Sequence, residues 1–363
     1  MKTKATKEPL IRIAKRTSLS KGYAYGVRAA SVAIALLACG IVLLLITSGK
    51  ISFGEIYGEM IQGAFGTARR VKITVRDTCA LLCLAVALAP AFKMRFWNIG
   101  AEGQALVGAL ASCVVVKLMP DTPAVLLILL MFVASVVAGA IWGVIPGYFK
   151  AKIKANETLF TLMMNYVAIQ LVAFFLKYFV KSGSGILAPM PEYGLPVIGE
   201  YSYLLNIIIV AVLTVLVYIY LKKTKHGYEI SVVGESENTA KYIGINVKKV
   251  IIRTLIVSGA LCGIAGLILV GGTNHTISTT TAGGRGFTAI MVSWLAKFNP
   301  IYMILTSFLI VFLEKGAGQV STDFRLPLAI SDIVTGIILF FIIGCEFFLN
   351  YKILVSKNGK END

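Results

Sequence analysis

The sequence predicts an all-α, polytopic transmembrane protein with about ten spans, some of them short or discontinuous. Hydrophobic residues make up 57% of the 363 residues and charged residues only 15%, and the mean hydropathy is +0.81. This composition is typical of a bundle of membrane helices, because a soluble domain would expose too much apolar surface. The apolar runs also alternate with short polar segments, as successive spans do.

Residues 1–28 predict a basic arm on the cytoplasmic side. Its Lys and Arg residues precede the first apolar run, so the positive-inside rule places it there and we expect no cleavable signal peptide. An even number of spans puts the lysine-bearing tail, residues 352–363, on the same side. The net charge of +17 follows this topology. No basic and aromatic face exists outside the apolar runs, so no nucleic-acid partner is expected.

We expect the transmembrane domain to cover residues 29–351, with a cytoplasmic loop at about 223–253. The ten charge-poor runs are 29–49, 78–92, 105–116, 122–149, 158–176, 201–221, 254–270, 286–296, 298–313 and 327–345. The third and eighth are shorter than the ~20 residues that a straight span needs, so they are expected to be tilted, broken or extended. Four basic positions conflict with this count, because they would lie near the outer face unless residues 54–67 form a surface helix: Arg69, Arg70, Lys72 and Arg76.

Glycines at four-residue steps predict where helices approach closely. Gly139, Gly143 and Gly147 form one such face, and a second has nearly the same spacing at Gly259, Gly263 and Gly266. Small residues on a membrane helix let the backbone of a neighbour come near.

The segment 94–105 is polar and glycine-bearing although it lies between two apolar runs. Polar side chains at that depth are costly unless they face protein or water, so Asn98, Glu102 and Gln104 indicate a pathway or an inter-helix site. For Glu102 we expect a buried hydrogen-bonding role that holds the third span. Its partner is either another polar side chain or a backbone turn.

A compact helical element is predicted inside the cytoplasmic loop. Ser236 is a suitable N-cap, residues 239–242 form a short helix, and Gly244 ends it. Such an element suits docking into a groove of a soluble partner, and a solvated linker helix is the alternative.

Catalytic and metal chemistry are not expected. The six cysteines are scattered through apolar runs and indicate small buried hydrophobes without disulfides. No histidine or carboxylate joins them at ligand spacing, so no metal site is predicted. A Gly-x-x-x-x-Gly-Lys-Ser/Thr phosphate loop is missing, so we expect no ATP hydrolysis by this chain, and no cofactor.

Five strings occur in an order that resembles a known family. They are FWNIGAEGQ at 96–104, NETLFTLMMNY at 156–166, GESENTAKYIGI at 234–245, SGALCGIAG at 258–266 and GGRGFTAI at 283–290. With them the chain resembles a permease subunit of a bacterial ABC importer, from the family that serves simple sugars, branched-chain amino acids and nucleosides. It is most similar to the nucleoside (guanosine-type) branch, over about residues 78–351.

The resemblance implies a set of partners and a place in the cell. The permease would pair with a second permease, either a homologous different chain or another copy of itself. It would work with two ABC ATPase subunits and an extracytoplasmic substrate-binding lipoprotein, in the lipid bilayer of the bacterial cytoplasmic membrane. The helical element in the loop would then be the coupling helix that enters a cleft of the ATPase. The implied coupling residues are Gly234, Glu235, Asn238, Ala240, Tyr242, Gly244 and Ile245.

A nucleoside is neutral and polar, so its pathway needs hydrogen-bonding groups together with surfaces for stacking. The predicted pathway residues are Phe96, Trp97, Asn98, Glu102, Gln104, Asn165, Tyr166 and Trp294. Two alternatives stay open. One is a permease of the same family for a simple sugar or branched-chain amino acids. The other is an ATP-independent secondary transporter, whose ion-binding carboxylate would be Asp332 or Glu102.

Overall fold

The computed structural model describes residues 11–16, 20–47, 49, 51–180, 187, 194–196, 203–327 and 329–355. These residues are mostly helical, which confirms the predicted all-α class. Within them, nine helices are long and apolar enough to cross a membrane. Parts of the predicted basic arm and most of the predicted C-terminal tail lie outside the described residues.

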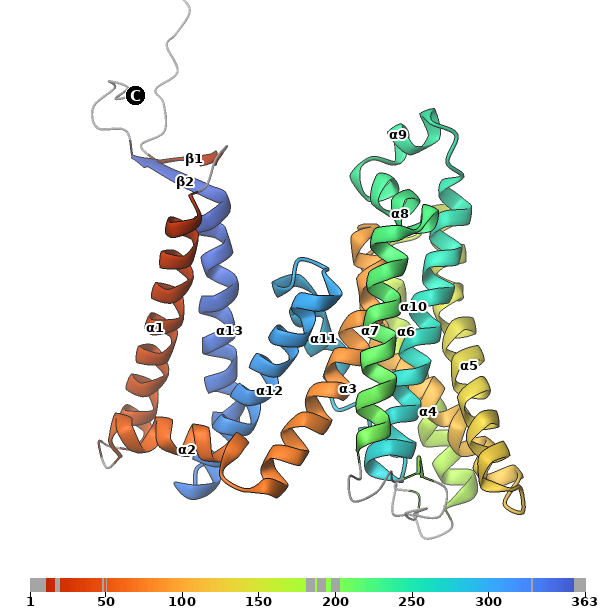
Figure 1. Ribbon diagram of the computed structural model, residues 1–363, viewed down its shortest axis with the longest axis horizontal. Helices are drawn as coiled ribbons and strands as arrows, with labels where there is room; N and C mark the ends of the chain where they lie inside the picture. Colours follow the sequence, from red (N-terminus) through yellow and green to blue (C-terminus); the bar gives the residue numbers. More distant parts are fainter. Residues whose placement is uncertain are drawn as a thin grey trace, which may run out of the picture. The chain divides into compact units, whose positions relative to one another are not determined.

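The elements follow one another along the chain as Figure 1 labels them. The nine long helices are α1 (Lys21–Ile46), α3 (Ala68–Lys93), α4 (Ala101–Leu118), α5 (Ala124–Ile153), α6 (Glu157–Phe179), α7 (Leu204–Lys223), α10 (Val247–Leu269), α12 (Pro300–Asp323) and α13 (Ala329–Asn350). The shorter elements are α2 (Phe53–Phe65), α8 (Lys225–Glu235), α9 (Glu237–Tyr242), the π-helix η2 (Val270–Asn274) and α11 (Arg285–Leu295). Two strands complete the set, β1 (Ile11–Lys15) and β2 (Tyr351–Val355).

The chain divides into two compact units. One combines residues 1–67 with 312–363, and the other comprises residues 68–311. In the first unit α1 and α13 lie side by side (Figure 1), and β1 pairs with β2 in antiparallel register. This pairing brings residues 11–15 next to residues 351–355. The start of α1 and the end of α13 therefore lie on the same side of this unit.

The amphipathic segment predicted at 54–67 forms α2. Ser52 and Glu55 make a reciprocal capping box at its start, which satisfies two backbone donors that a helix end otherwise leaves free. Ile56, Met60 and Ala64 are buried at four-residue spacing, so the helix has one packed face.

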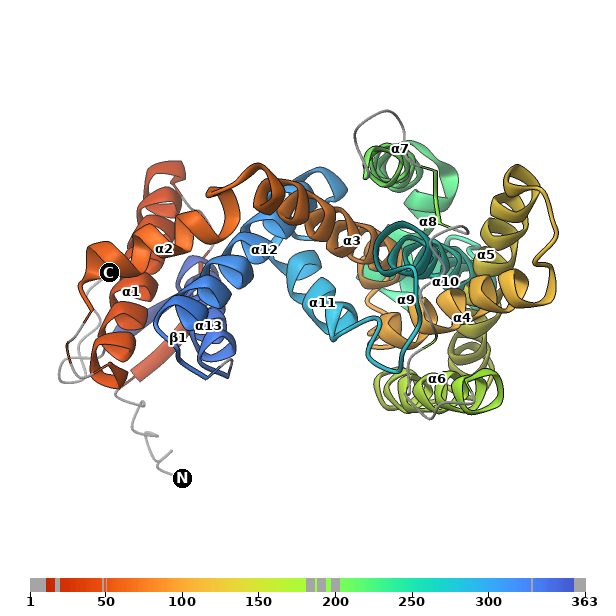
Figure 2. The ribbon, with the colours of Figure 1, turned by 90° about the horizontal axis from the view of Figure 1, so that it is seen from below.

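In the second unit α10 occupies the middle, with α3, α4 and α5 packed around it (Figure 2). The contact between α5 and α10 depends on the predicted glycines. A Cβ on Gly139 would lie 2.8 Å from the Cα of Gly263, and one on Gly143 would lie 2.9 Å from the Cα of Gly259. Any larger residue would force the two backbones apart, which confirms the predicted close approach.

The eighth predicted span, 286–296, is broken, one of the forms expected for it. It forms α11, which has only 11 residues and so would rise about 16 Å, roughly half of the hydrocarbon thickness. The chain nevertheless returns across the unit. Helix α10 leads away from α8, and α8 packs on the end of α3. The last turn of α11 contacts Trp97, which lies beside that same end of α3. Residues 275–295 therefore make this crossing as a loop followed by a short helix.

Two further boundaries differ from the prediction. Helix α3 begins at Ala68 and not at 78, so the four basic residues that conflicted with the topology lie on its first turns. The chain is helical again before residue 253, the end of the predicted cytoplasmic loop, because Asn246 caps α10 and the helix starts at Val247. In both cases charged residues extend a helix beyond its apolar part, which hydropathy alone does not detect.

Candidate functional site

The polar segment between α3 and α4 is a tight, internally bonded loop. The side chains of Asn98 and Gln104 are buried and face each other, with two amide contacts of 3.3 Å, and Asn98 Oδ1 also accepts from the backbone N–H of Gly100 at 3.0 Å. From α6, Asn165 donates to the carbonyl of Ile99 at 2.9 Å and accepts from the N–H of Gly103 at 2.8 Å. These amides thus hold the loop in place from inside the unit.

Glu102 connects two helix beginnings. Its side chain lies in the first turn of α4 and is 7% exposed. One carboxylate oxygen accepts from the N–H of Gly284 at 2.8 Å, and the other accepts from the N–H of Gly286 at 2.7 Å. Both helix N-termini carry partial positive charge, which favours a carboxylate between them. The partner of Glu102 is therefore a backbone turn, the second of the two predicted alternatives.

Gly286 is required for this close approach. A Cβ at that position would lie 2.7 Å from the Cα of Glu102, where nothing can move aside without shifting backbone. Gly286, the third glycine of the GGRGFTAI string, is thus explained by packing against α4 and needs no bound nucleotide.

A buried ionic group, which the sequence analysis missed, lies in the same region. Asp77 on α3 is 3% exposed and pairs with Arg76 at 2.8 Å, and Arg285 at the start of α11 approaches the same oxygen at 3.9 Å. The Arg76 guanidinium also lies 5.5 Å from the ring centre of Tyr203. Ionisable groups inside a membrane unit are paired in this way because isolated charges there are costly. The sequence signal for this group was Asp77 itself, an acidic residue in a helix whose other residues are basic, apolar or small.

Four aromatic rings gather where α3 ends and α11 ends. Trp97 and Trp294 stack with ring centres 5.1 Å apart and an interplanar angle of 28°. Phe92 packs edge-on against Trp97 and stacks on Phe298. The two indoles are 41% and 46% exposed, respectively, so their pair forms part of the unit's surface.

The structure therefore separates the predicted pathway residues into two sets. Buried residues hold the loop and α11 in place: Phe96, Asn98, Glu102, Gln104 and Asn165. Exposed aromatic residues face outward: Trp97, Tyr166 and Trp294. Tyr166 lies on α6 and is 58% exposed. The predicted role of these rings in the pathway stays a prediction.

The short helix in the predicted cytoplasmic loop agrees with its predicted caps. Ser236 accepts from the N–H of Thr239 at 3.2 Å at the start of α9. After the helix, Gly244 has φ +82°, a conformation that glycine adopts without strain. The predicted capping pattern is confirmed, although α9 begins at Glu237 and not at 239.

Helix α9 presents two apolar side chains at its end. Tyr242 is 92% exposed and Ile243 is 55% exposed, whereas Ala240 is completely buried. Of the other predicted coupling residues, Glu235, Asn238 and Gly244 are exposed, Ile245 is half-buried and Gly234 is buried. Ile243 was not predicted, because a six-residue helix is too short for the pattern to show which side faces out.

The helix before it, α8, is fixed to two long helices. Gly234 lies directly against the last turn of α3, where a Cβ would be 3.2 Å from the Cα of Met94. Glu229 on α8 pairs with Arg253 on α10 at 2.8 Å. A displacement of α8 and α9 would therefore act on the ends of both helices.

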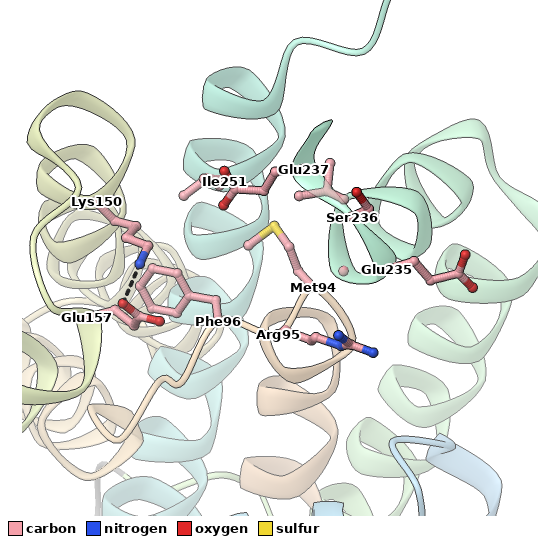
Figure 3. Close-up of a pocket in the computed structure, with 11 residues that line it drawn as sticks. Met94, Arg95, Phe96, Lys150, Glu157, Glu235, Ser236, Glu237 and Ile251 are labelled. Atoms are coloured by element: carbon pink, nitrogen blue, oxygen red, sulfur yellow. Dashed lines mark hydrogen bonds and ion pairs between the residues drawn. The ribbon is translucent and has the colours of Figure 1, made fainter. Parts of the chain in front are cut away.

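A pocket lies beside this element, between the end of α3, the α5–α6 connection and α8–α9 (Figure 3). Its volume is about 240 Å³. Met94, Phe96 and Ile251 supply its apolar lining, and Lys150 bonds Glu157 at 2.6 Å on one side. The pocket thus lies between the loop that carries Trp97 and the start of α9, the helix that carries Tyr242.

No group of three or more candidate metal ligands occurs among the residues that the structure describes. The structure also shows the surroundings of the two carboxylates considered for an ion-driven transporter. Glu102 is engaged by two backbone N–H groups, and Asp332 is exposed in the first turn of α13.

Comparison with known proteins identifies relatives over most of the chain. The family described as the permease component of branched-chain amino acid transport systems matches residues 71–343. The guanosine ABC transporter permease protein NupP of Bacillus subtilis is 31% identical over 84% of this chain and 89% of its own length. The glucose ABC transporter permease protein TsgB13 of Haloferax volcanii is 28% identical over 96% of this chain and 94% of its own length. The guanosine ABC transporter permease protein NupQ of Bacillus subtilis is 26% identical over 56% of this chain and 67% of its own length.

Proposed function

Because the chain belongs to the family of permease components of branched-chain amino acid transport systems, we propose that it forms the translocation pathway for nucleosides in an ABC importer. Permease subunits of this kind are not enzymes, and a separate ATPase subunit hydrolyses ATP. Its family thus implies ATPase subunits and a second permease as partners. We propose further that the importer works in a bacterial cytoplasmic membrane with an extracytoplasmic binding lipoprotein.

The observation that carries the nucleoside assignment is the exposed indole pair, Trp97 and Trp294. A flat, neutral base stacks on an aromatic face, and each such contact contributes about 1–3 kcal/mol. Ribose hydroxyls need polar partners as well, which we assign to the second permease or to residues that line the pathway only in another state. The relative NupP, which is named as a guanosine permease, supports the same substrate class.

For the second permease we propose a homologous but different chain. Two relatives from Bacillus subtilis, NupP and NupQ, are both named as guanosine permease proteins, and both match this chain. A pair of unlike permeases in one importer accounts for that observation, whereas a homodimer needs only one.

The proposed mechanism begins at α9. ATP binding draws the ATPase subunits together, and the exposed Tyr242 and Ile243 follow the cleft in which they sit. Since α8 is fixed to α3 through Gly234 and to α10 through the Glu229–Arg253 pair, the displacement reaches the loop with Trp97. The cavity then changes its opening from the outside to the inside, as alternating access requires.

Uptake into vesicles tests the proposal. The vesicles would contain this chain with its candidate ATPase, second permease and binding protein, and labelled guanosine, adenosine and uridine would be offered with unlabelled ribose and leucine as competitors. We expect ATP-dependent nucleoside uptake that only nucleosides inhibit. Nucleoside uptake that ribose or leucine inhibits as strongly as a nucleoside does would assign another substrate, and uptake without ATP would refute the importer mechanism.

A sugar is the second candidate substrate. The glucose permease TsgB13 matches 96% of this chain, and the faces of sugar rings also pack on indoles. The competition arm of the same experiment distinguishes the two, because ribose lacks the base that the indole pair would hold.

A further inference from the structure

Among the described residues, the two-stranded ribbon of β1 and β2 has no protein layer beneath it. Residues 11–15 pair with residues 351–355, and within the described residues no helix packs across the pair apart from α13, which leads directly into β2. An isolated pair of strands is marginally stable in water. The described residues therefore leave the ribbon without a supporting layer.

Its position fixes it at the membrane surface. β2 continues without a break from α13, and β1 is joined to α1 by a few residues, so both strands emerge at the ends of membrane-spanning helices (Figure 1). Tyr23 and Tyr351 lie at these helix ends and are 42% and 40% exposed. Tyrosines at such positions are typical of the boundary between lipid and water.

Arg16 holds the base of the ribbon. Its backbone N–H donates to the carbonyl of Asn350 at 2.9 Å, and its guanidinium donates to the carbonyl of Tyr351 at 3.3 Å and to the hydroxyl of Tyr23 at 2.8 Å. The same guanidinium lies 4.5 Å from the ring centre of Tyr23. Arg16 thus ties both strands to the start of α1 and is not available for another partner.

The remaining charges on the ribbon are all positive. Arg12, Lys15 and Lys352 are exposed, and neither 11–16 nor 351–355 contains an acidic residue. Ile13 is 58% exposed beside them. Alternation along β1 places Ile13 and Lys15 on one face and Arg12 on the other. Because Ala14 pairs with Lys352, Lys352 lies on the face of Arg12.

We propose that this ribbon binds the headgroups of anionic lipids. Ile13 and the tyrosine rings would enter the interfacial layer beside Lys15, while Arg12 and Lys352, on the other face of the ribbon, reach lipid phosphates with their long side chains. Basic residues close to a membrane surface are attracted by its negative potential, and a surface of this charge at this depth fits an anionic bilayer better than an acidic protein. The bound ribbon holds the two ends of the chain together on the membrane.

The test uses the full chain in lipid nanodiscs and an Ile13→Cys variant labelled with a polarity-sensitive fluorophore. The six native cysteines are all buried, so labelling is directed to position 13. Nanodiscs contain phosphatidylcholine alone or a mixture with phosphatidylglycerol. We expect a blue-shifted emission and protection from iodide quenching only in the mixture, and loss of both effects in high salt.

Charge neutralisation gives the quantitative arm. Each of Arg12→Gln, Lys15→Gln and Lys352→Gln should lower the ratio of protected to unprotected label roughly fivefold, which is the factor that one basic residue near the surface contributes. Lys177→Gln, an exposed lysine at the end of α6, is the matched control and should change nothing. Equal quenching in both lipid mixtures would overturn the proposal. Protection that appears only when the ATPase subunit is added would overturn it too, and would assign the ribbon to that protein.

Discussion

Replacing Glu102 with glutamine should release the start of α11 while leaving the rest of the unit folded. In the native chain the two carboxylate oxygens accept from Gly284 and Gly286 at 2.8 and 2.7 Å. Glutamine retains one oxygen, but its amide nitrogen carries hydrogens and must face the other backbone N–H. One of the two backbone N–H donors is then left unpaired in a buried site. The other donates to a neutral amide oxygen in place of a charged carboxylate oxygen.

The magnitude follows from these two changes. A hydrogen bond to a charged group contributes about 1.5–3 kcal/mol and a neutral one about 1 kcal/mol, so the sum of the loss and the weakening is roughly 3 kcal/mol. Because each 1.4 kcal/mol is a factor of ten, the population in which α11 has detached should rise roughly 100-fold.

Hydrogen–deuterium exchange of the purified chain in detergent measures this directly, since amide exchange reports local opening. In Glu102→Gln the amides of 284–288 should exchange about 100-fold faster. Glu157→Gln is the matched control, because it removes a partly buried carboxylate that pairs with Lys150, and it should leave 284–288 unchanged. Unaltered exchange in Glu102→Gln would show that the carboxylate does not hold the helix.

Three further substitutions test neighbouring features. Gly286→Ala places a Cβ 2.7 Å from the Cα of Glu102 and should cost about 1–3 kcal/mol, measured as a lower thermal midpoint of the detergent-solubilised chain; an unchanged midpoint would contradict the tight packing. Tyr242→Ala should weaken ATPase binding roughly 30-fold, since a central aromatic anchor contributes about 2 kcal/mol, whereas Ala240→Glu should instead unfold α9; equal ATPase affinity in Tyr242→Ala would place docking elsewhere. Trp97→Ala should raise the KM of nucleoside uptake roughly tenfold and Trp97→Phe much less, and the same KM in both would exclude stacking there.

Local features were predictable from the sequence because their chemistry is local. Ser236 and Gly244 delimit α9 through contacts within a few residues, and the glycine faces of α5 and α10 indicate that a neighbouring backbone comes close, although not which one. The all-α class follows from hydropathy alone. That the basic residues before residue 78 belong to α3 was not predictable in the same way. Hydropathy detects only the apolar part of a membrane helix, and α3 begins ten residues before that part.

The candidate site was only partly predictable, since its bonds join distant parts of the chain. The sequence indicates that Glu102 needs a partner, but it does not indicate that the partner is the backbone at Gly284. The pair of Asp77 with Arg285 and the stack of Trp97 on Trp294 are equally remote. Ala240 is buried beside an exposed Tyr242 because of the way α9 packs on its neighbours. A helix of six residues is too short for its hydrophobic periodicity to show this.

The bond between Glu102 and Gly284 also sets a condition on biosynthesis, because its partners are 182 residues apart. At about 5–20 residues per second, a ribosome needs roughly 10–40 s between the two. During that interval α4 is in or near the bilayer with a carboxylate that has not met its donors, and an unpaired charge there is costly. Glu102 must be hydrated or shielded by the insertion machinery until α11 arrives. Insertion of the short α11 in turn depends on α4 being in place, so this part of the permease is completed late and as a pair.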